Sequence, residues 1–178
     1  MKTWIAVILL VLAGSGALPI RAAELPLTGG KQGKFIDRPG TTADLGLVKF
    51  SGEPVLIAPP SPLCPARSFV QLRSSNQDNG LVELNCGWWS GSGDSFKYRD
   101  RSAVSGGVEQ IQLKKGRLKI KFRSANYVPL VGPAAWIETR LMVGSSSFCG
   151  RFATFKRNEP TLVMATAPST ACAPLPGR

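Results

Sequence analysis

Five cationic side chains of one short stretch near the middle of the chain could share one surface. Ammonium and guanidinium groups attract sulfate, phosphate and carboxylate groups, and several of them on one surface strengthen the attraction. The stretch therefore predicts contact with an anionic glycan or a cell-surface polymer. A solvated basic face that only keeps the protein soluble is the alternative. The five residues are Lys114, Arg117, Lys119, Lys121 and Arg123.

Two adjacent tryptophans offer a second kind of binding chemistry. Trp88 and Trp89, with Tyr98 nearby in the sequence, could form an aromatic platform that stacks on sugar rings. Adjacent residues of a strand point to opposite faces, so at most one of the two indoles is expected in the core. The other would then be exposed for ligand stacking, unless both close one end of the fold.

The sequence lacks the residue types and motifs of the common catalytic sites. Histidine is absent, which removes Ser-His-Asp triads, Cys-His pairs and histidine-ligated metal sites. No G-x-S-x-G elbow is present, and the acidic residues are scattered singly, without the recognisable pair of a glycoside hydrolase. We therefore expect no enzyme, no cofactor and no metal site. An uncharacterised hydrolase is the second alternative, after a carbohydrate-binding domain.

A predicted hairpin positions the five cations. The segment Val108–Arg123 (VEQIQLKKGRLKIKFR) reads as two strands joined at a Lys-Gly turn. Folding it there places Leu113 opposite Leu118 and Ile111 opposite Ile120, which gives one apolar face for a core. The opposite face then carries the cations. One ribbon thus supplies both a buried side and a charged side.

The same register argues against nucleic acid as the partner. It sets Phe122 opposite Glu109, away from the cations. Proteins that bind single strands usually interleave aromatic side chains with their basic residues, so that bases can stack. We therefore expect no specific nucleic-acid binding.

The rest of the chain predicts an all-β fold. Gly 19 and Pro 14 interrupt it often, and no segment after residue 23 keeps a helical period over ten residues. Residues 24–40 read as an extended leader or a first edge strand. The expected fold is one antiparallel β-sandwich domain, 24–178, built from consecutive hairpins. Its other strands are predicted near 45–50, 55–58, 68–74, 81–86, 96–100, 136–143, 148–155 and 161–166.

Two of these segments carry finer expectations. In Phe96–Asp100 the aromatic side chains alternate with Lys97 and Arg99, so the two kinds should face opposite sides. In the hairpin of residues 136–155, pairing Val143 with Phe148 gives a consistent inward face. It also brings Arg140 against Arg151, an unfavourable contact between like charges.

The N-terminus is predicted to be a secretory signal peptide, 1–23. Met1-Lys2 is followed by ten apolar residues and then by small residues, and cleavage is expected somewhere in 17–23. The apolar run is short for a membrane span, so contact with a membrane is expected only through this peptide. Removing it leaves 20 basic and 11 acidic residues, a net charge of +9.

The four cysteines are expected to form two disulfides. Their count is even, and the signal peptide directs the chain to an oxidising compartment. Three pairings are possible, and we favour the local one, Cys64–Cys86 with Cys149–Cys172, because it staples each half of the chain separately. The cysteines lack the close C-x-x-C pairs of a zinc site.

Four pieces from Phe96 onward resemble a known kind of domain. They are FKYRD at 96–100, GGV…LKKGRLKIK at 106–121, NYVPLVGP at 126–133 and FCGRFATFKRNEP at 148–160. In this order they are similar to an uncharacterised β-rich domain of secreted proteins from myxobacteria and related proteobacteria. The resemblance implies a secreted bacterial β domain. It carries over no activity and no site residues.

Together these features predict a secreted or periplasmic, non-catalytic binding or structural module. Its basic hairpin would contact anionic surfaces or polymers, and the alternative is a carbohydrate-binding domain that uses an exposed tryptophan. The sequence leaves the ligand, the cleavage site and the oligomeric state open.

Overall fold

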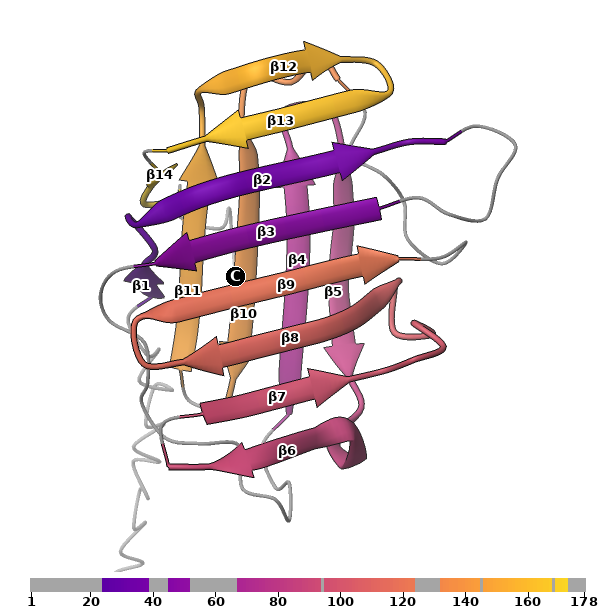
Figure 1. The fold of residues 1–178 in the computed structure, drawn as a ribbon, viewed down its shortest axis with the longest axis vertical. Coiled ribbons are helices and arrows are strands. Elements are labelled where there is room, and N and C mark those ends of the chain that lie inside the picture. Colours follow the sequence, from indigo (N-terminus) through magenta and orange to yellow (C-terminus); the bar gives the residue numbers. More distant parts are fainter. Residues whose placement is uncertain are drawn as a thin grey trace, which may run out of the picture.

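Two β-sheets pack face to face in this protein (Figure 1). The structure, a computed structural model, describes residues 24–38, 45–51, 67–93, 95–123, 132–144, 146–167 and 169–172. The strands of the front sheet run across those of the back sheet. This architecture confirms the predicted, mainly antiparallel β-sandwich. Within the described ranges no helix has the length and apolarity to span a membrane. The predicted signal peptide, 1–23, lies outside them.

The front sheet has eight strands in the order β12-β13-β2-β3-β9-β8-β7-β6, all paired antiparallel. Most neighbours are consecutive in the chain, as a series of hairpins requires. The bounds are β2 Gly30–Ile36, β3 Leu45–Ser51, β6 Trp89–Ser92, β7 Ser95–Arg99, β8 Val108–Lys114, β9 Arg117–Arg123, β12 Phe155–Glu159 and β13 Leu162–Thr166.

The back sheet runs in the order β1-β11-β10-β4-β5, and β14 also pairs with β11. The β1–β11 pair is parallel and the others are antiparallel. A single turn of 3-10 helix, Cys86–Trp88, leads from this sheet to β6 of the front sheet. The bounds are β1 Glu24–Pro26, β4 Ser68–Ser74, β5 Asp78–Leu84, β10 Ile137–Val143, β11 Ser146–Phe152 and β14 Ser169–Thr170.

The predicted leader or edge strand at residues 24–40 is divided between the sheets in its described part. The short β1 lies beside β11 of the back sheet, whereas β2 lies inside the front sheet between β13 and β3. Phe35 of β2 belongs to the hydrophobic core and is fully buried, so this strand is not an edge strand. The predicted strand at 55–58 lies outside the described residues.

The organising hairpin is β8–β9, and its register is largely as predicted. Ile111 pairs with Ile120 and Leu113 pairs with Leu118, and all four side chains are buried between the sheets. The turn contains Gly116 at a φ of 69°, a left-handed conformation that glycine adopts without strain. One face of the ribbon therefore belongs to the core, and the other faces away from it.

The far end of this hairpin corrects one expectation. Phe122 pairs with Val108 and not with Glu109, because the register shifts between Val108 and Gln110. Such a shift marks a bulge, in which one strand carries an extra residue. Both Phe122 and Val108 can then point into the core, where they are buried. Glu109 stays on the outside, half-buried beside Lys121.

The hairpin β10–β11 also differs from the predicted register. Val143 pairs with Ser146 rather than with Phe148, so the loop between the strands is shorter than expected. It begins at Gly144, whose φ of 59° suits a tight hairpin turn. Arg151 consequently lies opposite Glu138, and the predicted clash with Arg140 does not arise.

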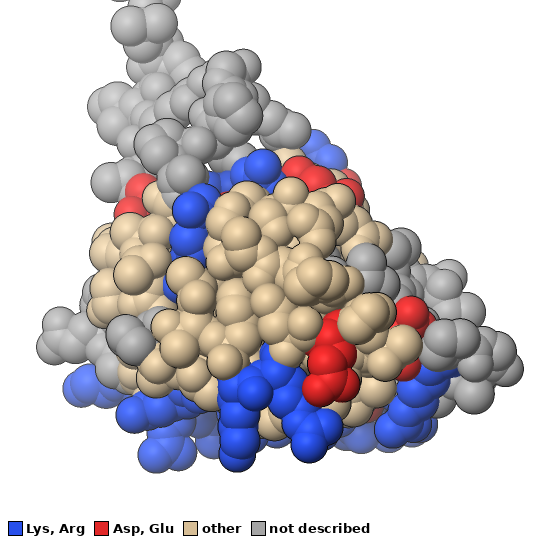
Figure 2. All heavy atoms as spheres, turned by 90° about the horizontal axis from the view of Figure 1, so that it is seen from above, with Lys and Arg blue, Asp and Glu red and all other residues tan. Residues whose placement is uncertain are grey.

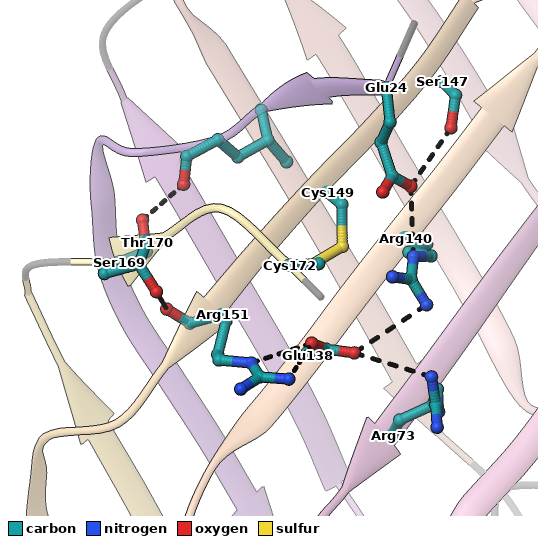
Figure 3. The surroundings of a disulfide bond; sticks show 11 residues. Glu24, Arg73, Glu138, Arg140, Ser147, Cys149, Arg151, Ser169, Thr170 and Cys172 are labelled. Carbon is teal, nitrogen blue, oxygen red and sulfur yellow. Dashed lines mark hydrogen bonds and ion pairs between the residues drawn. A yellow bond between two sulfur atoms is a disulfide. The ribbon is translucent and has the colours of Figure 1, made fainter. Parts of the chain in front are cut away.

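The corrected register builds a buried charge cluster on the back sheet (Figure 3). Glu138 and Arg140 are each only 1% exposed. The Glu138 carboxylate accepts from Arg151 at 2.6 and 2.8 Å and lies 3.7 Å from both Arg73 and Arg140. Arg140 Nε donates to Glu24 of β1 at 3.0 Å. Each of these buried charges therefore has an opposite charge beside it, as burial in a protein requires.

A disulfide fastens the C-terminal segment next to this cluster. Cys149 of β11 is bonded to Cys172 with a Cα–Cα distance of 5.8 Å (Figure 3). This pairing confirms one of the two predicted bridges. Cys86 is disulfide-bonded as well. Its predicted partner, Cys64, lies outside the described residues, so the Cys64–Cys86 pairing stays a prediction.

Candidate anion-binding face

All five predicted cations lie on the outer side of the front sheet. Along β9 the buried residues Leu118, Ile120 and Phe122 alternate with outward-facing basic residues. Lys114 and Arg117 pair across the hairpin next to its turn. The structure therefore brings together, on one side of two neighbouring strands, the set Lys114, Arg117, Lys119, Lys121 and Arg123.

Neighbouring strands extend this set in both directions. Lys49 of β3 lies directly opposite Lys119 of β9, and Lys34 of β2 follows one strand further on. On the other side, Lys97 and Arg99 of β7 flank the glutamines of β8. We call the whole surface the cationic face. It comprises Lys34, Lys49, Lys97, Arg99, Lys114, Arg117, Lys119, Lys121 and Arg123.

For the cations outside the hairpin, the sequence predicts only part of their placement on this face. Alternation predicts that Lys97 and Arg99 share one side of their strand, but not that this strand lies beside β8. Lys49 sits between the buried Val48 and Phe50, and this alternation is the signal that could have marked it as outward-facing. What the sequence lacks is the pairing of β3 with β9, which joins segments about seventy residues apart.

Within the part of the chain that the structure describes, few acidic side chains lie among these cations. Figure 2 looks at the molecule from the end where β12 and β13 lie, and Lys and Arg atoms gather along its lower edge, on the outer side of the front sheet. The strands β2, β3, β9, β8 and β7 contain one carboxylate, Glu109. Its 3.5 Å contact with Lys121 is the only ion pair that the cationic face makes with described residues.

The cations of the back sheet differ, because they are paired. Arg67 and Glu83 form two hydrogen bonds of 2.6 and 2.8 Å, and Arg73 lies 3.1 Å from Asp78. The hydrogen bond to Arg67 holds the pKa of the Glu83 carboxyl below its usual value. Arg140 and Arg151 belong to the buried cluster around Glu138. Uncompensated positive charge is therefore a property of the front sheet.

Two pockets hollow the cationic face. The first, of about 380 Å³, lies at the turn end of the hairpin, and its cations are Lys31, Lys49, Lys114, Arg117 and Lys119. Ser51 and Gln112 line it as well. The second, of about 300 Å³, lies at the opposite end of β9. It is lined by Lys97, Arg99, Arg101, Glu109, Gln110 and Arg123.

The aromatic rings of these five strands all lie on the other side of the sheet. Every aromatic side chain of β2, β3, β7, β8 and β9 points into the core and is at most 3% exposed. These residues are Phe35, Phe50, Phe96, Tyr98 and Phe122. The outward positions between the cations are instead amides, serines, aliphatic side chains and the carboxylate of Glu109. The surface therefore suits charge contacts and hydrogen bonds rather than stacking on bases.

The two tryptophans are buried to different extents, and at most one of them lies in the core, as predicted. Trp89 is 8% exposed, and its indole N–H donates to Ser68 Oγ across the sandwich at 3.0 Å. Trp88 is only partly buried, and its ring meets the Tyr98 ring edge-on at a centroid distance of 6.1 Å. Burial removes Trp89 from the predicted binding pair, because a sugar cannot reach its faces. Trp88 packs on the core cluster beside it.

Burial also shapes the titration of Tyr98. It raises the pKa of the phenol, and a 3.2 Å hydrogen bond to Ser105 opposes part of that shift. Asp100, which is also buried, accepts from the backbone N–H groups of Ser102 and Ser105. This carboxylate thus holds the loop between β7 and β8.

Among the described residues, no group of three or more His, Cys, Asp or Glu side chains could hold a metal ion.

Comparison with known proteins assigns this chain neither to a family nor to a function. No family model, no curated protein and no solved structure matches this chain. The resemblance of residues 96–160 to a secreted bacterial β domain therefore stays a prediction. The cationic face itself is the basis for assigning a function.

Proposed function

We propose that this protein is a secreted, non-catalytic binding module that holds an anionic glycan or a similar cell-surface polymer against its cationic face. The observation that carries the proposal is the lack of compensation. Of the basic side chains on that face, only Lys121 has a carboxylate partner among the described residues. Cations that remain unpaired and exposed on one surface attract polyanions at long range and bind them at contact.

The other features of the surface support a polymer as the ligand. The cations spread over five adjacent strands, which is wider than a small molecule needs. The burial of every ring on these strands disfavours single-stranded nucleic acid. The Cys149–Cys172 disulfide is consistent with a periplasmic or extracellular location, where acidic glycans are met.

The test is chromatography on an immobilised polyanion with a salt gradient. We expect the protein lacking residues 1–23 to be retained on heparin-agarose and to elute earlier as charges are removed. The slope of log affinity against log salt should fall by about one for each cation that no longer touches the polymer, as counterion release requires. Unmodified agarose serves as the uncharged matrix and should retain nothing.

A pair of matched variants separates the face from the net charge. The Lys119→Gln, Arg123→Gln variant removes one lysine and one arginine from the cationic face. The Arg67→Gln, Lys156→Gln variant removes the same charges from the back-sheet side and from the edge strand β12. We expect the first to bind about tenfold more weakly and the second to match the unaltered protein. Equal losses in both would mean that net charge alone causes retention, and the proposal would fail.

A further inference from the structure

The two pockets of the cationic face differ in chemistry. At the turn end the cations are mainly lysines, which act as flexible point charges. At the other end the guanidinium groups of Arg99, Arg101 and Arg123 predominate. A guanidinium donates two parallel hydrogen bonds to a carboxylate or to a similar planar anion, so this pocket suits a carboxylate better than a diffuse charge.

The second pocket is also lined by a carboxylate and an amide, which a ligand that carries only negative charges does not require. Glu109 and Gln110 line it beside the arginines. A carboxylate only accepts hydrogen bonds, and it repels a bare anionic chain such as polyphosphate. A sugar hydroxyl can donate to Glu109 and accept from Gln110 while a carboxylate on the same sugar ring reaches an arginine. The lining therefore matches an acidic sugar.

The distance between the pockets sets the length of the ligand. Arg117 and Lys119 line the first pocket, and Arg123 lines the second. Arg123 follows Arg117 by six steps along the extended strand, which corresponds to about 20 Å at ~3.4 Å per residue. Lys121 lies between them on the same side of β9. A chain that follows β9 would meet cations along its whole path.

From these observations we infer that the two pockets bind two acidic sugar units of one polysaccharide chain at the same time. This inference rests on the proposed function and adds the class of ligand and its mode of binding. Once one unit occupies either pocket, the next is delivered at a high effective concentration, so a chain that spans both gains affinity without any new kind of contact.

The experiment is calorimetric titration with oligogalacturonates of defined length. A decasaccharide spans the gap, whereas a disaccharide cannot. We expect the decasaccharide to bind at least about a hundredfold more tightly than the disaccharide. In Arg117→Gln and in Arg123→Gln the affinity for the decasaccharide should fall by about tenfold or more, since each variant weakens one of two linked pockets. A linear polyphosphate of similar length should bind more weakly than the decasaccharide.

The possible failures are distinguishable. If both oligosaccharides bind with equal affinity, or if only one of the two arginine variants affects the decasaccharide, simultaneous occupancy is wrong while the proposed function stands. Polyphosphate that binds as tightly as the decasaccharide would overturn the acidic sugar as the ligand. If the protein is not retained on any polyanion, the proposed function itself fails, and this inference fails with it.

Discussion

Lys49 on β3 and Lys119 on β9 are directly opposite each other in the front sheet. Neither has a carboxylate partner among the described residues, and the other cross-strand neighbour of Lys119 is the neutral Gln112. Like charges in this position destabilise a sheet by roughly 0.2–1 kcal/mol. The cationic face therefore carries a stability cost that a neutral side chain would relieve.

Lys119→Gln tests for this cost. The amide keeps most of the side-chain length and removes the repulsion, so we expect stability to rise by about 0.5 kcal/mol. For a chain of this size that corresponds to an increase in Tm of about 1–2 °C. Thermal unfolding followed by circular dichroism or calorimetry measures it, and Lys156→Gln on β12 serves as the control with no expected gain.

Salt dependence makes the test specific. The Debye length falls from about 10 Å at 0.1 M salt to about 3 Å at 1 M, so screening should erase most of the gain. The same variant should bind a polyanion more weakly, which would make Lys119 a residue that serves binding at the expense of stability. A Tm that falls in Lys119→Gln, or a gain that persists unchanged at 1 M salt, would refute the electrostatic origin.

Three further outcomes are expected. Replacing Cys149 and Cys172 by serine opens a loop with a sequence separation of 23. By the loop-entropy model this should lower the free energy of unfolding by about 3 kcal/mol, which corresponds to a Tm lower by about 6–12 °C. An unchanged Tm would contradict this prediction. Trp89→Phe should cost about 2 kcal/mol because buried Ser68 loses its hydrogen-bond donor. Adding Ser68→Ala should restore part of that stability in denaturant titrations, and a further decrease would count against the hydrogen bond. Because the folded-state pKa of Tyr98 is raised, chiefly by burial, its contribution to stability is complete below the unfolded pKa of about 10 and is lost as the pH rises through the folded value. Denaturation profiles from pH ~8 to ~11 should therefore fall less steeply in Tyr98→Phe, and parallel profiles would exclude the phenol as the cause.

Among the described residues, the basic side chains of the back sheet are paired with carboxylates, whereas most of those on the front sheet are not, and this contrast bears on the function. On the back sheet, Glu138 gathers three arginines around itself, and the exposed Arg67 has Glu83. On the front sheet, five adjacent strands share one carboxylate. A chain that was basic only for solubility would not need its compensated and uncompensated charges on separate faces. We regard this segregation as the main support for a binding role.

Local pattern was enough to predict much of the fold. Alternation along β9, and along β8 from Ile111 onward, specified which side chains face the core, because the side chains of a strand alternate between its two faces. The glycine in the turn then specified the pairing of Leu113 with Leu118. The cation set on this hairpin followed from the same alternation, whereas the Cys149–Cys172 bridge followed from pairing cysteines that are close in the sequence.

Tertiary structure decided what depends on partners distant in the sequence. The pairing of β3 with β9 added Lys49 to the cationic face, and the packing of β6 against β4 of the other sheet buried Trp89 on Ser68. In the β10–β11 hairpin, the shorter loop brings Glu138 beside Arg151, where their charges compensate each other. Alternation fixes the face of each side chain but not its neighbour across the sheet. The neighbour depends on which strands can pack side by side so that their apolar faces are buried and every buried charge has a partner. These conditions involve the whole sandwich and not one strand.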